Sequence, residues 1–213
     1  MILNNHSKLK GMHAFLGAST PAWLNYNDEI FTQRYYAQYA ITIGTTIHEL
    51  AEDCIKSKMY IHKHDGHLIE HALYSAGVPK DAYDTGELLA NLLPFINDAI
   101  GFRMEPEVIL YYSDNCFGTS DALIFDEKAK YIKIHDLKTG QTPAKMEQLM
   151  IYCALLCLEY HLRPQEYDIE LRIYQSGNII FYKPEFLEVE KIMDLIIFRD
   201  QCINKIKERN GML

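Results

Sequence analysis

Hydrophobic and polar positions alternate with different periods in the two halves of the chain. The first half has apolar residues at helical spacing, and glycines or prolines interrupt the pattern between segments. The second half has short runs rich in valine, isoleucine and tyrosine, which is typical of strands. Helices are expected at 34–59, 66–77 and 84–101, and strands at 107–113, 118–125 and 131–138.

Three further kinds of element complete the pattern. A proline in the first turn and a preceding threonine as N-cap predict another helix, and a Ser-Gly pair predicts a strand hairpin after it. These elements are the helix from Pro143 to about Tyr160 with Thr142 as N-cap, the strands Asp168–Gln175 and Asn178–Tyr182, and a long amphipathic helix at about 184–208. This order predicts an α/β fold with a mixed sheet at its centre.

The second and third predicted strands bring two aspartates together. Their connection, 126–130, is so short that the strands must form an antiparallel hairpin. A turn centred between residues 128 and 129 pairs Asp121 with Asp136 and, if they are directly opposed, places their Cβ atoms about 5 Å apart. A shift of the register by one or two residues would still leave both aspartates at the same end of the hairpin. Such close carboxylates repel each other unless a cation lies between them, and Mg²⁺ or Mn²⁺ prefers these ligands. Lys138 lies on the same strand face as Asp136, and this combination is suited to phosphodiester hydrolysis.

The next predicted helix adds polar groups that could serve the same chemistry. Gln148 and Tyr152 share a helix face, with Lys145 one turn earlier. An amide, a phenol and an ammonium group on one stripe suit contacts with phosphate and sugar. A solvated helix face would show the same pattern, and an Asp-x-Lys pair alone is common, so the order of the motifs carries more information than any one of them.

Taken in order, these motifs resemble a known family. Gly118–Asp121, Asp136–Gly140 and the pair Gln148 and Tyr152 are similar to the G-x-x-D, D-x-K-T-G and Q-x-x-x-Y motifs of the RecB-like branch of the PD-(D/E)XK nucleases. Gly44–Glu49 resembles the G-T-x-x-H-E helix of that branch. The segments 16–19 and 22–25, and the tail Ile173–Gln175 with its helix, also resemble a phage-encoded group of RecB-like proteins. The resemblance is weakest between about residues 60 and 100.

The resemblance implies both a fold and a set of site residues. The fold is one restriction-endonuclease-like domain, with a mixed sheet flanked by helices. Its parts are a helical region at 1–106 that carries His48, a catalytic sheet and helix at 107–182, and a C-terminal helix at 183–213. The implied metal ligands are His48, Asp121, Asp136 and the main-chain carbonyl of Leu137. Lys138 would position the attacking water, Gln148 and Tyr152 would orient the lysine or bind the substrate backbone, and Glu107 and Lys145 are further candidates.

The implied activity is Mg²⁺- or Mn²⁺-dependent hydrolysis of DNA, as an exonuclease in phage DNA recombination, replication or processing. DNA is the expected partner, with a phage recombination protein or a second copy of the chain as further candidates. Two alternatives stay open: a metal-dependent endonuclease, and a catalytically silent nuclease fold that serves as a binding module. Asp136 stands where many relatives have glutamate, which shortens the reach to the metal.

Composition narrows the class of protein. Hydrophobic residues make up 48% of the chain, enough for a packed core. The net charge of −8 argues against an extended nucleic-acid interface, although a bound divalent ion would reverse the local sign. The five cysteines include no C-x-x-C pair, and no signal peptide or membrane-length apolar run is evident. We therefore expect a reduced cytoplasmic protein (host cytoplasm if phage-encoded), without an iron–sulfur cluster or membrane contact.

Three other parts of the sequence have residues that could form a site. His48–Glu52 lacks the second histidine of a zinc-protease motif. The histidines at 62, 64, 67 and 71 indicate either a zinc site or, more commonly, a solvated run. Trp23 and the tyrosines at 26, 35, 36 and 39 could stack on bases, but such aromatic residues are more often core.

Overall fold

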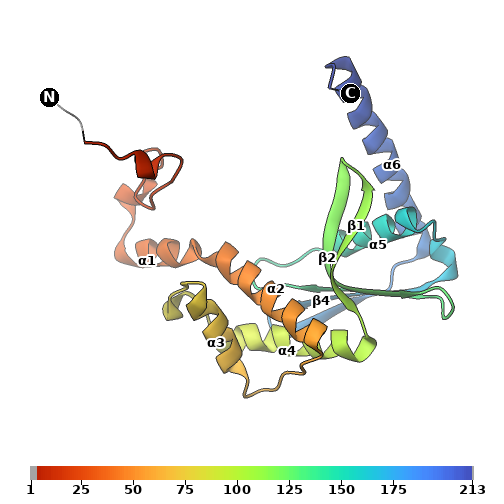
Figure 1. The fold of residues 1–213 in the computed structure, drawn as a ribbon, viewed down its shortest axis with the longest axis horizontal. Helices are drawn as coiled ribbons and strands as arrows, with labels where there is room; N and C mark the ends of the chain where they lie inside the picture. The colour runs from red at the N-terminus through yellow and green to blue at the C-terminus, as the bar shows by residue number, and fades with distance from the viewer. Residues whose placement is uncertain (1–3, 213) are drawn as a thin grey trace.

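The computed structural model describes residues 4–212, which form an α/β fold around a five-stranded sheet (Figure 1). The strands lie in the order β1-β2-β3-β4-β5, and only β3 and β4 are parallel. Their bounds are β1 Glu105–Ser113, β2 Cys116–Asp126, β3 Tyr131–Leu137, β4 Asp168–Gln175 and β5 Asn178–Tyr182. The predicted α/β class and the mixed sheet are confirmed.

Helices cover both faces of this sheet. They are α1 Asp28–Ala37, α2 Ala40–Ser57, α3 Gly66–Ser75, α4 Thr85–Phe102, α5 Glu147–Glu159 and α6 Phe186–Arg209. Short 3₁₀ helices lie at Ser7–Leu9, Pro21–Asn25, Lys80–Ala82 and Pro164–Glu166. The α5 helix is the crossover that parallel pairing of β3 and β4 requires. No helix among residues 4–212 is both long and apolar enough to cross a membrane.

Two hydrophobic clusters lie on opposite faces of the sheet. The first packs α2, α3 and α4 against the sheet, with Ile47, Phe95 and Leu137 among its buried members. The second packs α5 and α6 against the other face and includes Ile132 and Ile134. Since side chains alternate along a strand, Asp136 shares the α5 face with these two isoleucines. Cys153 and Cys157 are buried in the second cluster, where their side chains pack among hydrophobic residues.

The β2–β3 hairpin has the expected register. Its pairs run from Asp126–Tyr131 to Ala122–His135. One further step of the same register sets Asp121 opposite Asp136. The short connection and the strand pattern were therefore sufficient to align these two carboxylates.

Two predicted helix boundaries were wrong. The segment 34–59 is not one helix, because α1 ends at Ala37 and α2 begins at Ala40. At this break, the Gln38 side chain donates a hydrogen bond of 2.7 Å to the carbonyl of Tyr35 and competes with the helical bond there.

The second wrong boundary is the start of α5, which begins at Glu147 and not at Pro143, so Thr142 is no cap. The side chain of Gln175 causes this difference. It donates to the carbonyls of Gly140 and Thr142, at 2.6 and 2.8 Å, and accepts the N–H of Ala144 at 2.9 Å. These bonds hold the segment out of the helix.

The N-terminal arm, residues 4–37, carries no buried side chain and projects away from the sheet (Figure 1). The expectation that Trp23 and the nearby tyrosines form core is therefore wrong for all but Tyr39, which packs partly against the first cluster. Several of these aromatic residues pack on one another instead, as Phe15 does on Tyr35. Base stacking by the arm stays a prediction.

Candidate active site

The candidate site is formed by residues of β1, β2 and β3 together with residues of α2 and α5, two helices that pack on opposite faces of the sheet. The N–H of Leu137 donates a hydrogen bond of 2.7 Å to Oδ2 of Asp121, which fixes this carboxylate on the end of β3. Asp136 is 1% exposed on the neighbouring strand. The two predicted aspartates are thus brought together from separate strands.

His48 approaches Asp121 from α2. Its Nδ1 lies 3.4 Å from Oδ1 of Asp121 and 4.0 Å from Oε1 of Glu107. The buried residues Ile47 and Ala51 hold α2 against the sheet, which leaves His48 on the adjoining face. One ligand atom from each of His48, Glu107 and Asp121 lies within 4.8 Å of the others. Glu107, a candidate added from the resemblance, is therefore part of the group.

Glu107 has an unusual backbone conformation. Its φ is +52°, in the left-handed region, although it lies within β1 between the pairs Pro106–Ala122 and Val108–Ser120. This conformation costs a non-glycine residue about 1–2 kcal/mol. Strain of this kind is concentrated at functional sites, where a side chain must be aimed at a ligand.

A chain of polar contacts extends from Asp136 towards α5. The Lys138 ammonium group lies 3.0 Å from Oδ1 and 2.9 Å from Oδ2 of Asp136, and it donates to Oε1 of Gln148 at 3.0 Å. The Gln148 amide donates in turn to the Tyr152 hydroxyl at 2.9 Å. Gln148 and Tyr152, one turn apart on α5, therefore form a chain of hydrogen bonds with the Lys138 ammonium group.

Three residues that sequence reasoning missed hold these groups in place. Asn91, buried on α4, donates to the carbonyl of Lys138 at 3.1 Å and accepts the N–H of Gly177 at 2.7 Å. Gln175 holds the segment after Lys138, as described above. Gly118 leaves room for Tyr152, since a Cβ there would lie 2.9 Å from the tyrosine Cε1. Gly118 and Gln175 had a sequence signal, as the first residue of the G-x-x-D motif and the last residue of the tail 173–175, whereas Asn91 had none.

Burial and mutual repulsion raise the pKa values of the acidic groups. Burial, and then the charge of Asp121, raises the pKa of Asp136 to about 6, although Lys138 opposes this. Burial followed by the charge of Asp121 likewise raises the pKa of Glu107. Burial alone would lower the pKa of His48, but contact with Asp121 and the charge of Glu107 raise it overall. All three groups therefore bind protons more readily than they would in water.

The donor set fits a hard divalent cation. Two carboxylates and an imidazole converge, and oxygen-rich sites with one histidine suit Mn²⁺ and Mg²⁺. Asp136 lies beside this group, and its buried Oδ2 accepts no hydrogen bond of acceptable geometry from a described residue, despite the nearby lysine. A cation would satisfy this oxygen and relieve the repulsion among the carboxylates. The proposed carbonyl ligand of Leu137 stays a prediction.

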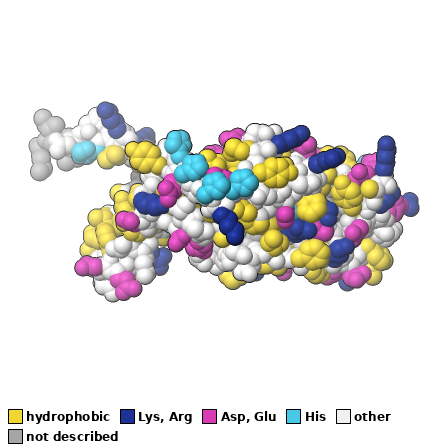
Figure 2. Space-filling model, turned by 90° about the horizontal axis from the view of Figure 1, so that it is seen from below, with side chains coloured by type: hydrophobic (Ala, Val, Ile, Leu, Met, Phe, Trp, Pro, Cys, Tyr) yellow, Lys and Arg dark blue, Asp and Glu magenta, His cyan; other side chains and the backbone are white. Residues whose placement is uncertain are grey.

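Two other candidates lie outside the site. Lys145 precedes α5 and is exposed, so it does not continue the stripe of Gln148 and Tyr152. Figure 2 shows a row of histidine side chains on the lower face of the molecule. The rings of His62 and His64 stack with their centroids 5.6 Å apart. None of the histidines at 62, 64, 67 and 71 belongs to a group of three metal-ligand side chains within residues 4–212.

The site thus combines a three-residue metal-ligand group with a buried aspartate, a fixed lysine and two supporting polar side chains. The elements that supply them are far apart in the chain. No family model, curated protein or solved structure matches this sequence, so its chemistry is interpreted from its own geometry.

Proposed function

We propose that this protein is a divalent-metal-dependent nuclease with a RecB-like PD-(D/E)XK core. One observation carries the proposal: the metal-ligand group of His48, Glu107 and Asp121 lies beside Asp136, whose carboxylate holds Lys138. Convergent carboxylates with a lysine supply what phosphodiester hydrolysis needs. The motif resemblance supports the same conclusion independently of the geometry.

The chain's own residues have distinct parts in the proposed reaction. A divalent cation, when bound, would activate a water molecule and stabilise charge on the phosphate. The Lys138 ammonium group would hold the attacking water or neutralise a phosphoryl oxygen, because Asp136 and Gln148 fix its direction. The Lys138 ammonium group can only donate, so it meets the Gln148 amide oxygen, and the NH₂ group is left to donate to the Tyr152 hydroxyl.

The proposed substrate is DNA, with exonuclease action in phage DNA recombination, replication or processing. One observation favours a different function: the net charge of −8 is more typical of a silent binding module than of a DNA-binding enzyme. The charge, however, is a global sum, and the site itself keeps its aspartate and lysine side chains in contact. An endonuclease would use the same residues.

Cleavage assays separate these functions. End-labelled linear DNA and circular DNA, single- and double-stranded, are incubated with Mg²⁺, Mn²⁺ or EDTA. We expect linear DNA to be degraded with metal, and Asp121→Ala, Asp136→Ala and Lys138→Ala to abolish the reaction while circular dichroism shows an intact fold. Asp126→Ala, on the same strand as Asp121, is the control that keeps activity. Cleavage of circles would indicate an endonuclease. An absence of both cleavage and Mn²⁺ binding would indicate the binding module.

A further inference from the structure

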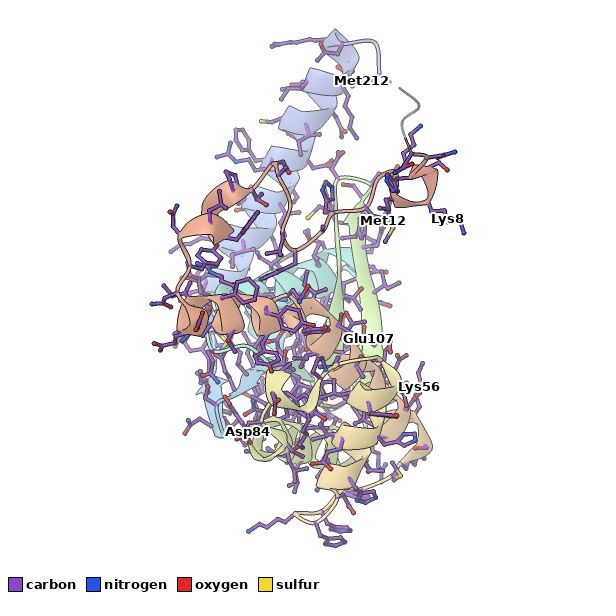
Figure 3. The ribbon with its side chains drawn as sticks, turned by 90° about the vertical axis from the view of Figure 1, so that its left-hand side faces the viewer. Lys8, Met12, Lys56, Asp84, Glu107 and Met212 are labelled. Carbon is purple, nitrogen blue, oxygen red and sulfur yellow. The ribbon has the colours of Figure 1, made fainter. Side chains whose placement is uncertain are left out.

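A second cleft adjoins the candidate site along α2. His48, Glu52 and Lys56 lie at intervals of four residues on one face of that helix. His48, Glu52 and Glu107 are among the residues that line the hollow over the metal-ligand group. The second cleft has a volume of about 460 Å³, and Lys56 is the residue of this helix face that lines it. Figure 3 shows Lys56 and Glu107 on the same side of the molecule. A ligand strand could therefore pass from one hollow to the next.

The second cleft is basic, although the chain as a whole is acidic. Its charged lining consists of Lys56, Lys58, Arg103 and Glu105. Lys56 is paired with Glu52. Lys58 and Arg103 are exposed and form no ion pair with any residue in 4–212. Two unpaired cations thus face a hollow with a single competing carboxylate.

These two cations occupy positions that usually favour glycine. Lys58 is the C-cap of α2 with φ +56°, and Arg103 is the C-cap of α4 with φ +59°. Cations at helix C-termini interact favourably with the helix dipole, but this gain is smaller than the left-handed penalty of a residue with a Cβ. Glycine could therefore replace either residue without strain, so both charges can be removed without disturbing the fold.

An aromatic side chain completes the lining. Tyr60 is 51% exposed and lies in the same cleft as both cations. Cationic grooves with exposed aromatic rings are how proteins hold single-stranded nucleic acids, because each unpaired base offers a face for stacking. A paired base does not offer that face.

We propose that this cleft binds the sugar-phosphate backbone of a single-stranded nucleic acid, with Lys58 and Arg103 on phosphates and Tyr60 stacked on a base. This proposal rests on the proposed nuclease function, which would supply the strand that the cleft binds. Lys56 lies about 12 Å along α2 from His48, so one bound strand could reach both hollows. The cleft would thus hold the strand beside the nucleotide that is cut.

Glycine substitutions test the proposal without disturbing the fold. The double variant Lys58→Gly/Arg103→Gly removes both charges and also the left-handed strain, so we expect its Tm to equal or exceed that of the native chain. Lys130→Gly is the matched control, because Lys130 is an exposed lysine with φ +55°. It precedes β3, roughly 20 Å from the end of that strand where the site lies.

Binding is measured by fluorescence anisotropy with labelled oligothymidylate, oligouridylate and a DNA duplex. EDTA is present, so that neither metal nor cleavage contributes. Binding is compared at salt concentrations between about 50 and about 200 mM. At the lower salt concentration, we expect the double variant to bind single strands at least roughly tenfold more weakly than the native chain. The slope of log affinity against log salt concentration should be shallower by about 1.4 in the double variant. Tyr60→Ala should weaken binding severalfold, and Lys130→Gly should not. The DNA and RNA strands show which sugar the cleft prefers.

Three results would overturn the proposal: no binding by the native chain, equal losses in the double variant and Lys130→Gly, or equal affinity for the duplex. Mn²⁺ titration of the double variant distinguishes failure of the cleft proposal from failure of the nuclease proposal. Unchanged Mn²⁺ affinity with weaker oligonucleotide binding supports the cleft. Loss of Mn²⁺ binding in the double variant shows that the substitutions disturbed the metal site, and it too counts against a separate cleft.

Discussion

The main-chain N–H of Leu137 donates a hydrogen bond of 2.7 Å to Oδ2 of Asp121. The two oxygens of this carboxylate therefore have different contacts, because Oδ1 faces Nδ1 of His48 at 3.4 Å. Oδ2 links β2 to β3, and Oδ1 is available to a ligand. The structural and the proposed metal-binding roles of Asp121 can therefore be separated by changing one oxygen.

Asp121→Asn makes this separation. The amide oxygen can accept the Leu137 bond, while the NH₂ group then faces His48, so we expect a Tm within a few degrees of native. Mn²⁺ affinity, measured by isothermal titration calorimetry, should fall roughly tenfold or more. Asp126→Asn is the control, because Asp126 also accepts main-chain N–H bonds, from Lys128 and Ala129, at the other end of β2. Native Mn²⁺ affinity in Asp121→Asn would remove Asp121 from the ligand set.

Glu107→Gly should raise the stability of the protein and weaken its binding of Mn²⁺. Glycine adopts a φ of +52° without strain, so we expect a gain of about 0.5–1 kcal/mol in the free energy of unfolding after the entropic cost of glycine. Mn²⁺ affinity should fall, since a ligand is lost. Glu107→Gln keeps the strained backbone and removes only the charge, so it should weaken Mn²⁺ binding with a smaller gain in stability. Denaturant titration that shows Glu107→Gly to be less stable than Glu107→Gln would contradict the strain argument.

Gly118→Ala should disturb the support of the lysine. The new Cβ would lie 2.9 Å from the Tyr152 ring, which must move and so weaken its bond to Gln148. We expect a loss of about 1–3 kcal/mol in stability and slower DNA cleavage with Mn²⁺ affinity retained. In a Tyr152→Ala background the cost of Gly118→Ala should shrink, because the two residues are in contact.

Gly101→Ala is the matched control for this pair. Gly101 lies in α4 with open space around its Cβ position, so alanine should stabilise the helix by about 0.5–1 kcal/mol. If Gly118→Ala stabilised the protein as Gly101→Ala is expected to do, the close approach of Tyr152 to β2 would not be what requires glycine at position 118.

Asp136, Glu107 and His48 should favour the folded metal-free protein as the pH falls from about 7.5 to about 5.5, whereas His135 opposes them, because burial lowers its pKa to about 3. Asp136, Glu107 and His48 all have raised pKa values, so each binds a proton more tightly in the folded state than in the unfolded chain. For Asp136 the stability is complete below its ordinary pKa of 3.8 and is lost as the pH rises through about 6. For His48 the stability is likewise present at low pH and lost as the pH rises through its raised value.

Thermal unfolding in EDTA measures this dependence. The Tm of the native chain minus that of Asp136→Asn should rise as the pH falls, because the amide does not titrate. Saturating Mn²⁺ should reverse this trend, since protons and metal compete for the same groups. A Tm difference that stays constant over this range would contradict the raised pKa of Asp136.

The sequence by itself determined the order of the elements and the pairing of Asp121 with Asp136. Both follow from local rules: strand and helix periods are visible within a few residues, and a short connection admits only an antiparallel hairpin. The shared face of Gln148 and Tyr152 was also local, because i, i+4 positions on a helix are neighbours. The motifs in turn drew attention to His48 and Glu107.

Only the tertiary structure decided how these parts meet. Gln175, from a later strand, holds the segment 140–144 out of α5, so no local propensity could place that helix start. Asn91 reaches the Lys138 carbonyl from a helix that the sequence did not link to the site. The left-handed conformations of Glu107, Lys58 and Arg103 were likewise hidden, because glutamate, lysine and arginine carry no signal for positive φ. Local rules see a few neighbouring residues, whereas side-chain bonds between distant elements and strained backbone depend on the packing of the whole chain.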